Sequence, residues 1–88
     1  MAWKIEFNPH VEKDLRALER KEQHRIRDFL NERVAVLDDP RSIGEALKGT
    51  LAGLWKYRVG PYRIISQIQD EAITILVIRI GHRQEVYR

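Results

Sequence analysis

Hydrophobic and polar residues alternate at the start of the chain. "AWKIEF" places Trp3, Ile5 and Phe7 on one side of an extended backbone, with charged residues on the other side, which predicts a half-buried strand. Asn8 and Pro9 follow directly. Asparagine is a preferred N-cap and proline is favoured in the first turn, so a helix is expected to begin here.

Apolar residues then recur at helical spacing in two segments separated by the charged stretch "ERKE". The first segment predicts a short helix and the second a longer helix that ends at "DDPRS". The charged residues of both helices mix the two signs, as expected of solvated faces with local ion pairs. The two apolar stripes are Val11, Leu15 and Leu18 in the first helix, and Ile26, Leu30, Val34 and Leu37 in the second.

Strand-like segments fill the last third of the chain. Residues 41–54 contain several glycines and are predicted to form a loop, and strands are predicted over 55–60, 62–69 and 72–80. A turn at Asp70-Glu71 joins the last two. The final segment, "AITILVIRI", is apolar on both faces, which indicates a central strand covered by the helices on one side and partly screened on the other.

These elements predict an α+β fold in one domain spanning residues 1–88. An N-terminal strand and a two-helix hairpin precede a three-stranded antiparallel meander, and the helices pack on one face of the sheet. The residues expected in the core between helices and sheet are Trp3, Ile5, Leu15, Leu18, Ile26, Leu30, Val34, Tyr57, Ile64, Leu76 and Ile78.

The tip of the first predicted hairpin is Gly60-Pro61. Proline cannot adopt the positive φ that a type I′ turn needs at its second central residue, whereas type II′ needs positive φ only at the first, where Gly60 stands. A two-residue II′ turn places Val59 opposite Tyr62. Every pairing further along the hairpin follows from this one.

The same register places two arginines directly opposite each other. Arg58 faces Arg63 and Lys56 faces Ile65, so three cations share the hairpin face that points away from the core. A like-charge pair at this position is unfavourable by roughly 0.2–1 kcal/mol. Such a cluster calls for an anion or an acidic partner.

Composition limits the class of protein. The 88 residues contain no cysteine, which favours a reducing cytoplasm, and no apolar run approaches the roughly 18 residues that span a membrane. Residues 1–40 hold 8 Lys and Arg against 9 Asp and Glu, whereas residues 41–88 hold 8 against 4. The basic C-terminal half favours a polyanion or acidic protein as partner, although a solvated basic surface would show the same pattern.

The sequence shows no glycine-rich phosphate loop, no histidine and carboxylate set at metal-ligand spacing, and no nucleophile elbow, so neither a metal nor a cofactor is expected. What remains is the cation cluster and the tail "GHRQEVYR". Arg83 and Tyr87 follow the central strand, where the chain can fold back beside Lys56, Arg58 and Arg63. Cations beside a stacking ring are typical of a single-stranded RNA site.

Nearly the whole chain resembles the RelE toxins of bacterial toxin–antitoxin pairs. The resemblance lies in "FNPHVEKDLRAL", "LKGTLAGLWKYRVGPYRIISQI" and "ILVIRIGHRQEVYR". It implies a ribosome-dependent endoribonuclease that cleaves messenger RNA in the decoding site and is held inactive by a cognate antitoxin. Contact with DNA is expected only through the complex with that antitoxin.

The resemblance also implies roles for single residues. The family's functional lysine pair falls at Lys56 and Arg58. Arg58 departs from that pair, because it is an arginine. A guanidinium group can stabilise charge but is a poor proton acceptor. The family's phosphate-binding arginine falls at Arg63, its second functional arginine at Arg83 and its tyrosine at Tyr87. Lys48, in "LKG", is assigned with Arg58 to RNA and phosphate binding.

Metal-free cleavage by the ribose 2′-hydroxyl suits these residues, with Lys56 as the favoured base or proton carrier. His82 is an alternative acid, although strand alternation turns it away from Arg83. Two functions of other classes stay open. The ParE branch of the superfamily shares the architecture and poisons DNA gyrase without RNA chemistry, and a catalytically silent module would only bind its antitoxin or ribosomal RNA.

Overall fold

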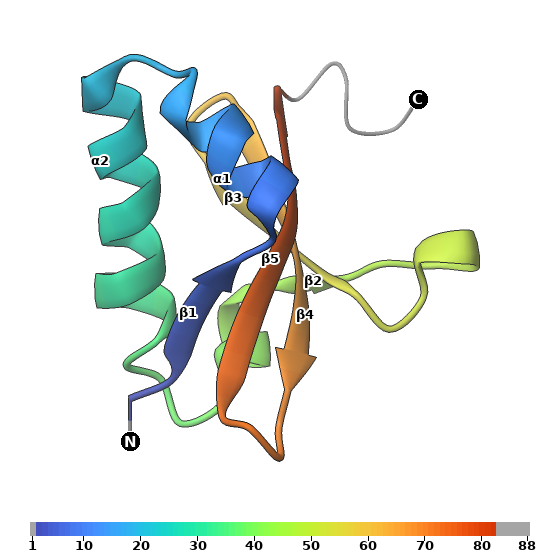
Figure 1. Cartoon of the computed structure of the whole chain (residues 1–88). Helices are drawn as coiled ribbons and strands as arrows, with labels where there is room; N and C mark the ends of the chain where they lie inside the picture. Colours follow the sequence, from blue (N-terminus) through green and yellow to red (C-terminus); the bar gives the residue numbers. More distant parts are fainter. Residues whose placement is uncertain (1, 83–88) are drawn as a thin grey trace.

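The computed structural model describes residues 2–82, which form a curved sheet with its helices on one side (Figure 1). The elements, in chain order, are β1 (Lys4–Phe7), α1 (Pro9–Arg16), α2 (Arg20–Asp28), η1 (Phe29–Val34), η2 (Pro40–Ile43), β2 (Glu45–Ala46), η3 (Gly49–Leu51), β3 (Trp55–Val59), β4 (Tyr62–Gln69) and β5 (Thr74–His82). The α+β class predicted from the sequence is confirmed. None of the helices described within residues 2–82 has the length and apolar character needed to cross a membrane.

The first helix begins as its sequence predicts. The side chain of Asn8 accepts a hydrogen bond of 3.2 Å from the backbone N–H of His10, and Pro9 occupies the first turn. This bond satisfies one of the amide groups that have no partner within the helix. Val11 and Leu15 are fully buried from the inner side of the same helix.

The second helix changes its hydrogen-bond pattern before it ends. α2 continues into η1, a π-helical segment, and the N–H of Ala35 closes it by donating to the carbonyl of Leu30 at 2.8 Å. Ile26, Leu30 and Val34 are fully buried, as predicted. Leu37 lies beyond the end of the helix, so the predicted stripe is one turn too long.

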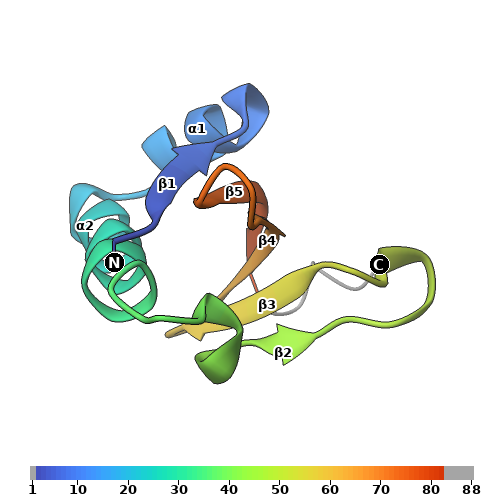
Figure 2. The same ribbon diagram turned by 90° about the horizontal axis from the view of Figure 1, so that it is seen from below.

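Five strands form the sheet in the order β1-β5-β4-β3-β2. β1 pairs in parallel with β5, whereas β5, β4, β3 and β2 pair antiparallel in turn. β5 therefore has a neighbour on each side, which confirms the central strand predicted from its apolar sequence. The view from below in Figure 2 shows how the sheet curves around α2.

The predicted loop over residues 41–54 is only partly a loop. Two of its residues form β2, which adds a fifth strand by pairing Glu45 with Lys56 and Ala46 with Trp55. The stretch is glycine-rich and β2 is too short to show alternation, so sequence periodicity could not reveal it. Beyond β2 the chain extends through η3 away from the helices before it returns as β3 (Figure 2).

The turn before β5 is also longer than predicted. It spans residues 70–73, and Ile73 adopts a positive φ of 48°, so the strand begins at Thr74 rather than at residue 72. Arg41 holds this turn: its guanidinium donates to both carboxylate oxygens of Asp70, at 3.1 and 2.6 Å, and to Asp39 at 3.3 Å. The hydrogen bond with Asp70 raises the pKa of Arg41, and the same bond lowers the pKa of Asp70.

The core lies between the helices and the inner face of the sheet, which we call the helix face. Most predicted members belong to it or pack against it, but Leu76 and Ile78 do not. Ile75 and Val77 take their places, because Ile75 pairs with Ile5 and Val77 with Phe7 on that face. Within "AITILVIRI", residues 75–78 are all apolar, so alternation alone could not tell which of them face inward.

Candidate functional site

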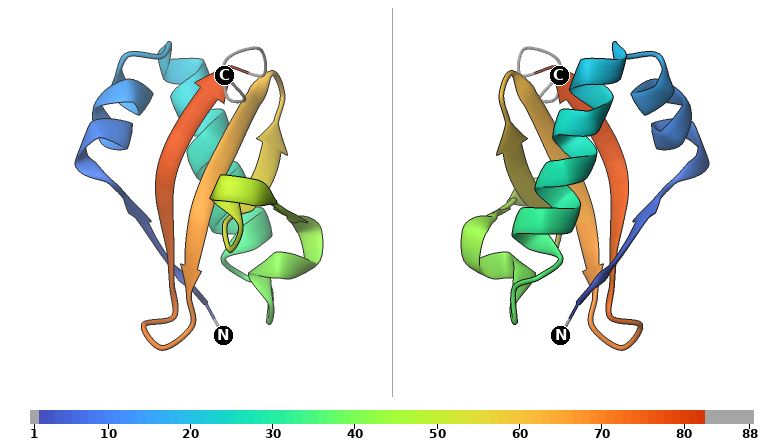
Figure 3. Two further views of the ribbon diagram at one scale, coloured as in Figure 1. Left: turned by 90° about the vertical axis from the view of Figure 1, so that its right-hand side faces the viewer. Right: turned by 90° about the vertical axis from the view of Figure 1, so that its left-hand side faces the viewer.

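The β3–β4 hairpin has the register predicted from its turn. Gly60 has a positive φ of 59°, and the pairs Val59–Tyr62, Arg58–Arg63 and Lys56–Ile65 all form. The sheet face opposite the helices, which carries Arg58 and Arg63, is called the cation face below. In Figure 3 (left) α2 lies behind the sheet and the segment with η3 stands in front of this face.

Lys56 and Arg58 share this face but differ in exposure. The side chain of Arg58 is 62% exposed, whereas that of Lys56 is 7% exposed. Lys56 is therefore buried, although it lies on the sheet face opposite the helices. A buried ammonium group requires a compensating charge or hydrogen bonds.

Glu45 supplies a negative charge to both cations. Its Oε2 atom lies 3.6 Å from Nζ of Lys56, and its Oε1 atom lies 3.7 Å from Nε of Arg58. Sequence reasoning missed this residue, because it treated residues 41–54 as a loop. The cluster of three cations predicted from the sequence therefore also contains a carboxylate. The pairing of Glu45 with Lys56 across β2 and β3 is the feature that brings the carboxylate here.

Arg63 lies on the next strand, directly opposite Arg58. Its side chain is half-buried, and its Nε atom is buried from solvent. On its other side, Arg63 pairs with Gly81 of β5, which has no side chain. The structure thus brings Lys56, Arg58 and Arg63 together on the cation face, as the sequence predicted.

The remaining predicted site residues are not placed with these three. Arg83 and Tyr87 lie outside the described residues. Lys48 is exposed and lies between β2 and η3, on none of the strands that carry the cluster. Its contact with RNA stays a prediction.

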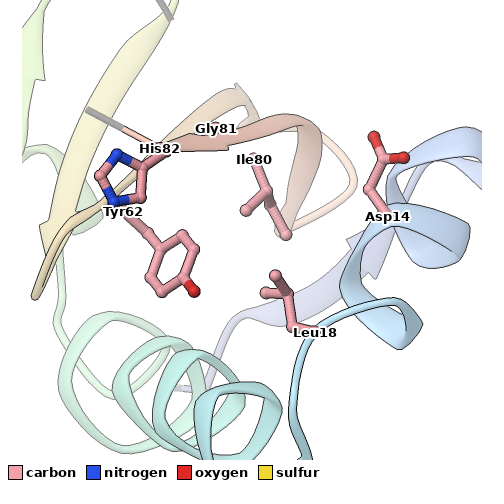
Figure 4. A pocket seen from close by; sticks show the side chains of 6 residues that line it. All are labelled: Asp14, Leu18, Tyr62, Ile80, Gly81 and His82. Carbon is pink, nitrogen blue, oxygen red and sulfur yellow. The ribbon is translucent and has the colours of Figure 1, made fainter. Parts of the chain in front are cut away.

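His82 lies on the helix face. It pairs with Tyr62, and the two rings meet edge to face with centroids 5.9 Å apart. Figure 4 shows both rings at the edge of a cavity of about 300 Å³, together with Leu18 and Asp14 from α1 and the segment that follows it. Burial, followed by the nearby carboxylates of Glu22 and Glu19, raises the pKa of Tyr62. Since Lys56 is on the opposite face, His82 does not join the cluster.

The described part of the site combines three cations with one carboxylate. Guanidinium groups on two adjacent strands match the geometry of a phosphate group, which accepts several hydrogen bonds at once. The cations can also stabilise charge that develops on a phosphate during reaction. This arrangement fits an anionic ligand such as the backbone of RNA.

The comparisons with known proteins agree on one superfamily. The family model "ParE toxin of type II toxin-antitoxin system, parDE" matches residues 5–87. Toxin RelG of Mycobacterium tuberculosis is 38% identical over 50 residues, which make up 57% of this chain and 58% of that protein. The chain thus matches less than two thirds of the length of this curated relative.

Solved structures match over more of their length. A chain of the toxin–antitoxin complex RelBE2 from Mycobacterium tuberculosis aligns with a TM-score of 0.84 and 26% identity, covering 97% of this chain and 95% of that chain. A chain of the intact RelBE complex from E. coli aligns with a TM-score of 0.71 and 28% identity, covering 92% of this chain and 96% of that chain. Because the family model extends over nearly all of its residues, the chain belongs to the ParE toxin family of type II toxin–antitoxin systems, within the RelE/ParE superfamily.

Proposed function

We propose that this toxin is a ribosome-dependent endoribonuclease that acts in the cytoplasm, where it cleaves messenger RNA in the decoding site and so inhibits translation. The observation that carries this proposal is the convergence of Lys56, Arg58 and Arg63 on one sheet face. A protein that acts only by contacting another protein has no need for a buried lysine beside two opposed arginines. A phosphate bound between them would offset their repulsion.

The reaction is attack of a ribose 2′-hydroxyl on the adjacent phosphate, which forms the new P–O bond and releases the 5′-oxygen of the next nucleotide. Arg63 and Arg58 bind the phosphate and stabilise its growing charge. Lys56, as the neutral amine, takes the proton from the attacking hydroxyl, and the ammonium group it becomes gives a proton to the departing 5′-oxygen. Arg83 is proposed to stabilise the leaving oxygen and Tyr87 to stack on the base; both roles rest on the resemblance to RelE toxins.

The proposed partners are the ribosome with its bound message and a cognate antitoxin. Support for the antitoxin comes from the two solved relatives described above, both of which are chains of toxin–antitoxin complexes. An antitoxin segment with acidic and apolar residues would complement the cation face and block it. Lys48 is proposed as an outer phosphate contact, and any binding to DNA is proposed to occur only through the toxin–antitoxin complex.

Primer extension on a translated message tests the activity. After induction of the toxin, breaks in phase with codons are expected, and they should disappear when the antitoxin is co-expressed. The Arg63→Ala variant should leave the message intact. A wild-type toxin that stops growth without cutting the message would overturn the proposal.

Two other functions are each favoured by one observation. The matching family model carries the ParE name, which favours gyrase poisoning, and DNA double-strand breaks after induction would identify it. Glu45 already pairs with Lys56 and Arg58 at 3.6 and 3.7 Å, which favours a module that binds without cleaving. Ribosome binding that leaves the message uncut would identify this second alternative.

A further inference from the structure

Arg79, on the central strand β5, is a fourth cation on the cation face. It pairs with Ile65, which in turn pairs with Lys56, so these three residues form one row across β5, β4 and β3. Paired residues of neighbouring strands share a face, and Arg79 therefore points to the same side as Lys56. Its side chain is exposed.

Arg79 is also close to Arg63. Arg63 pairs with Gly81, and Arg79 is two residues before Gly81 on the same strand. Such a diagonal pair is separated by about 7–8 Å, within reach of two long side chains. Gly81 itself adds no side chain to the face between them. A glycine in a strand often marks a place where a ligand approaches the backbone closely.

The charges around the cluster are asymmetric. On the β2 side, the carboxylate of Glu45 contacts Lys56 and Arg58. On the β5 side, within residues 2–82, no carboxylate forms an ion pair with Arg79. Glu6 of β1 lies further along this face, opposite Leu76, and is held by Lys4 at 3.0 Å. A polyanion that crosses the face is repelled at β2 and attracted at β5.

We propose that the RNA strand runs from the Arg58–Arg63 pair across Gly81 toward β5, where Arg79 binds a phosphate next to the scissile one. This inference rests on the proposed function and assigns a second phosphate subsite to the same face. The residue sets how the message lies across the sheet, and it takes no part in the bond-breaking step.

Neutral phosphates in the message test the contact directly. Single-turnover cleavage on ribosomes is measured with three messages: one unmodified, and two carrying a methylphosphonate at the phosphate on one or the other side of the scissile bond. With the wild-type toxin, one of the two replacements should slow cleavage by about tenfold, the effect of one lost charge-assisted contact. With Arg79→Gln, the same replacement should have no further effect, because the contact is already absent.

Arg20→Gln is the matched control, since it removes the same charge from an exposed position at the start of α2. It should keep the full penalty of the wild-type toxin. If Arg79→Gln also keeps that penalty while wild-type toxin cleaves the unmodified message, the Arg79 subsite is wrong and the proposed function stands. If wild-type toxin does not cleave at all, the proposed function fails and the subsite with it.

Discussion

The two faces of the β3–β4 hairpin are built from alternate residues of the same strands, yet one face is buried in the core and the other carries the cation cluster. On the helix face, Tyr57 and Ile64 pair with each other and are 1% and 0% exposed. On the cation face, their neighbours Arg58 and Arg63 pair with each other. One residue along the chain therefore separates a core position from a position in the cation cluster.

Burial on the helix face also explains how the repulsion between Arg58 and Arg63 is tolerated. Burial of one large apolar side chain contributes about 1.5–3 kcal/mol, whereas an opposed like-charge pair costs roughly 0.2–1 kcal/mol. The helix face therefore fixes the register of the hairpin, and the cations opposite are carried along with it. The hairpin can therefore carry three mutually repelling cations, because the stability of the hairpin comes from its other face.

Truncating a buried side chain on the helix face should cause the greatest loss of stability. Ile64→Ala removes a fully buried side chain from the centre of the core, and we expect it to lower the free energy of unfolding by about 2–5 kcal/mol. Urea denaturation followed by circular dichroism measures this change. The control Arg58→Gln, on the neighbouring strand and opposite face, should stay within about 0.5 kcal/mol of wild type. Equal losses in the two variants would remove the distinction between the faces.

On the cation face, the expected loss is in rate rather than in stability. Lys56→Met keeps most of the side-chain volume at this buried position and removes its charge, and we expect cleavage to fall by roughly 10²–10³-fold, or about 3–4 kcal/mol. Single-turnover cleavage on saturated ribosomes measures the reaction step without product release.

Arg63→Ala provides the contrast within the cluster, because Arg63 is expected to contact the phosphate both before and during reaction. Its affinity for the ribosome with bound message and its cleavage rate should fall together, whereas Lys56→Met should spare affinity. Cleavage at the wild-type rate by Lys56→Met would exclude the lysine as proton carrier. Glu45, the carboxylate beside it, would then become the first residue to test as base.

Sequence reasoning succeeded where a local rule fixed the geometry. The turn residues Gly60 and Pro61 indicated the hairpin register, and that register predicted Arg58 opposite Arg63, as the structure shows. It failed where the hydrophobic pattern does not distinguish the two faces of a strand. β5 is apolar on both faces, so Leu76 was predicted in the core in place of Ile75.

The misses at the site have a similar cause. Glu45 reaches Lys56 through a strand of two residues, and no periodicity can be read from so short a segment. Arg79 joins the cation face through its pairing with Ile65, and the register of β4 and β5 shifts by one residue directly beside this pair. Long-range pairing of this kind follows from the folded sheet and not from neighbouring residues.

Raising the pH can place a negative charge on the helix face, at the phenol of Tyr57. Burial, with a smaller effect from Asp39, raises the pKa of Tyr57 to about 12, although Arg41 acts in the opposite direction. In the unfolded chain the phenol of Tyr57 ionises near pH 10. The neutral phenol therefore contributes its full stabilisation to the fold below pH 10, and this contribution is lost as the pH rises through about 12. The loss should reach about 2–3 kcal/mol, the value of a two-unit difference in pKa.

Tyr57→Phe isolates this effect from the other groups that titrate at alkaline pH. At pH 8 the variant should be less stable by about 1–3 kcal/mol, because the carbonyl of Pro40 loses the 2.7 Å hydrogen bond that the phenol donates. Above pH 10 the difference from wild type should shrink, since phenylalanine cannot ionise. Urea denaturation at pH 8, 10 and 11.5 measures both changes. A difference that stays constant across these pH values would show that Tyr57 does not titrate as proposed.

A smaller loss of stability is expected at the Gly60-Pro61 turn, which joins β3 and β4. Gly60→Ala forces a positive φ of 59° on a residue with a side chain, which costs about 1–2 kcal/mol in free energy of unfolding. The added Cβ would also lie 2.6 Å from Nη1 of Arg25, but that guanidinium ends a flexible side chain and can move. The cost should therefore persist in an Arg25→Ala background. Gly49→Ala, with φ of 67° and nothing within 4 Å, is the matched control and should show a similar loss in urea denaturation.

Because burial on the helix face holds the register, cleavage by Gly60→Ala should fall by less than about tenfold. A hundredfold loss of cleavage with only this modest loss of stability would show instead that the turn, rather than the core, positions the cations.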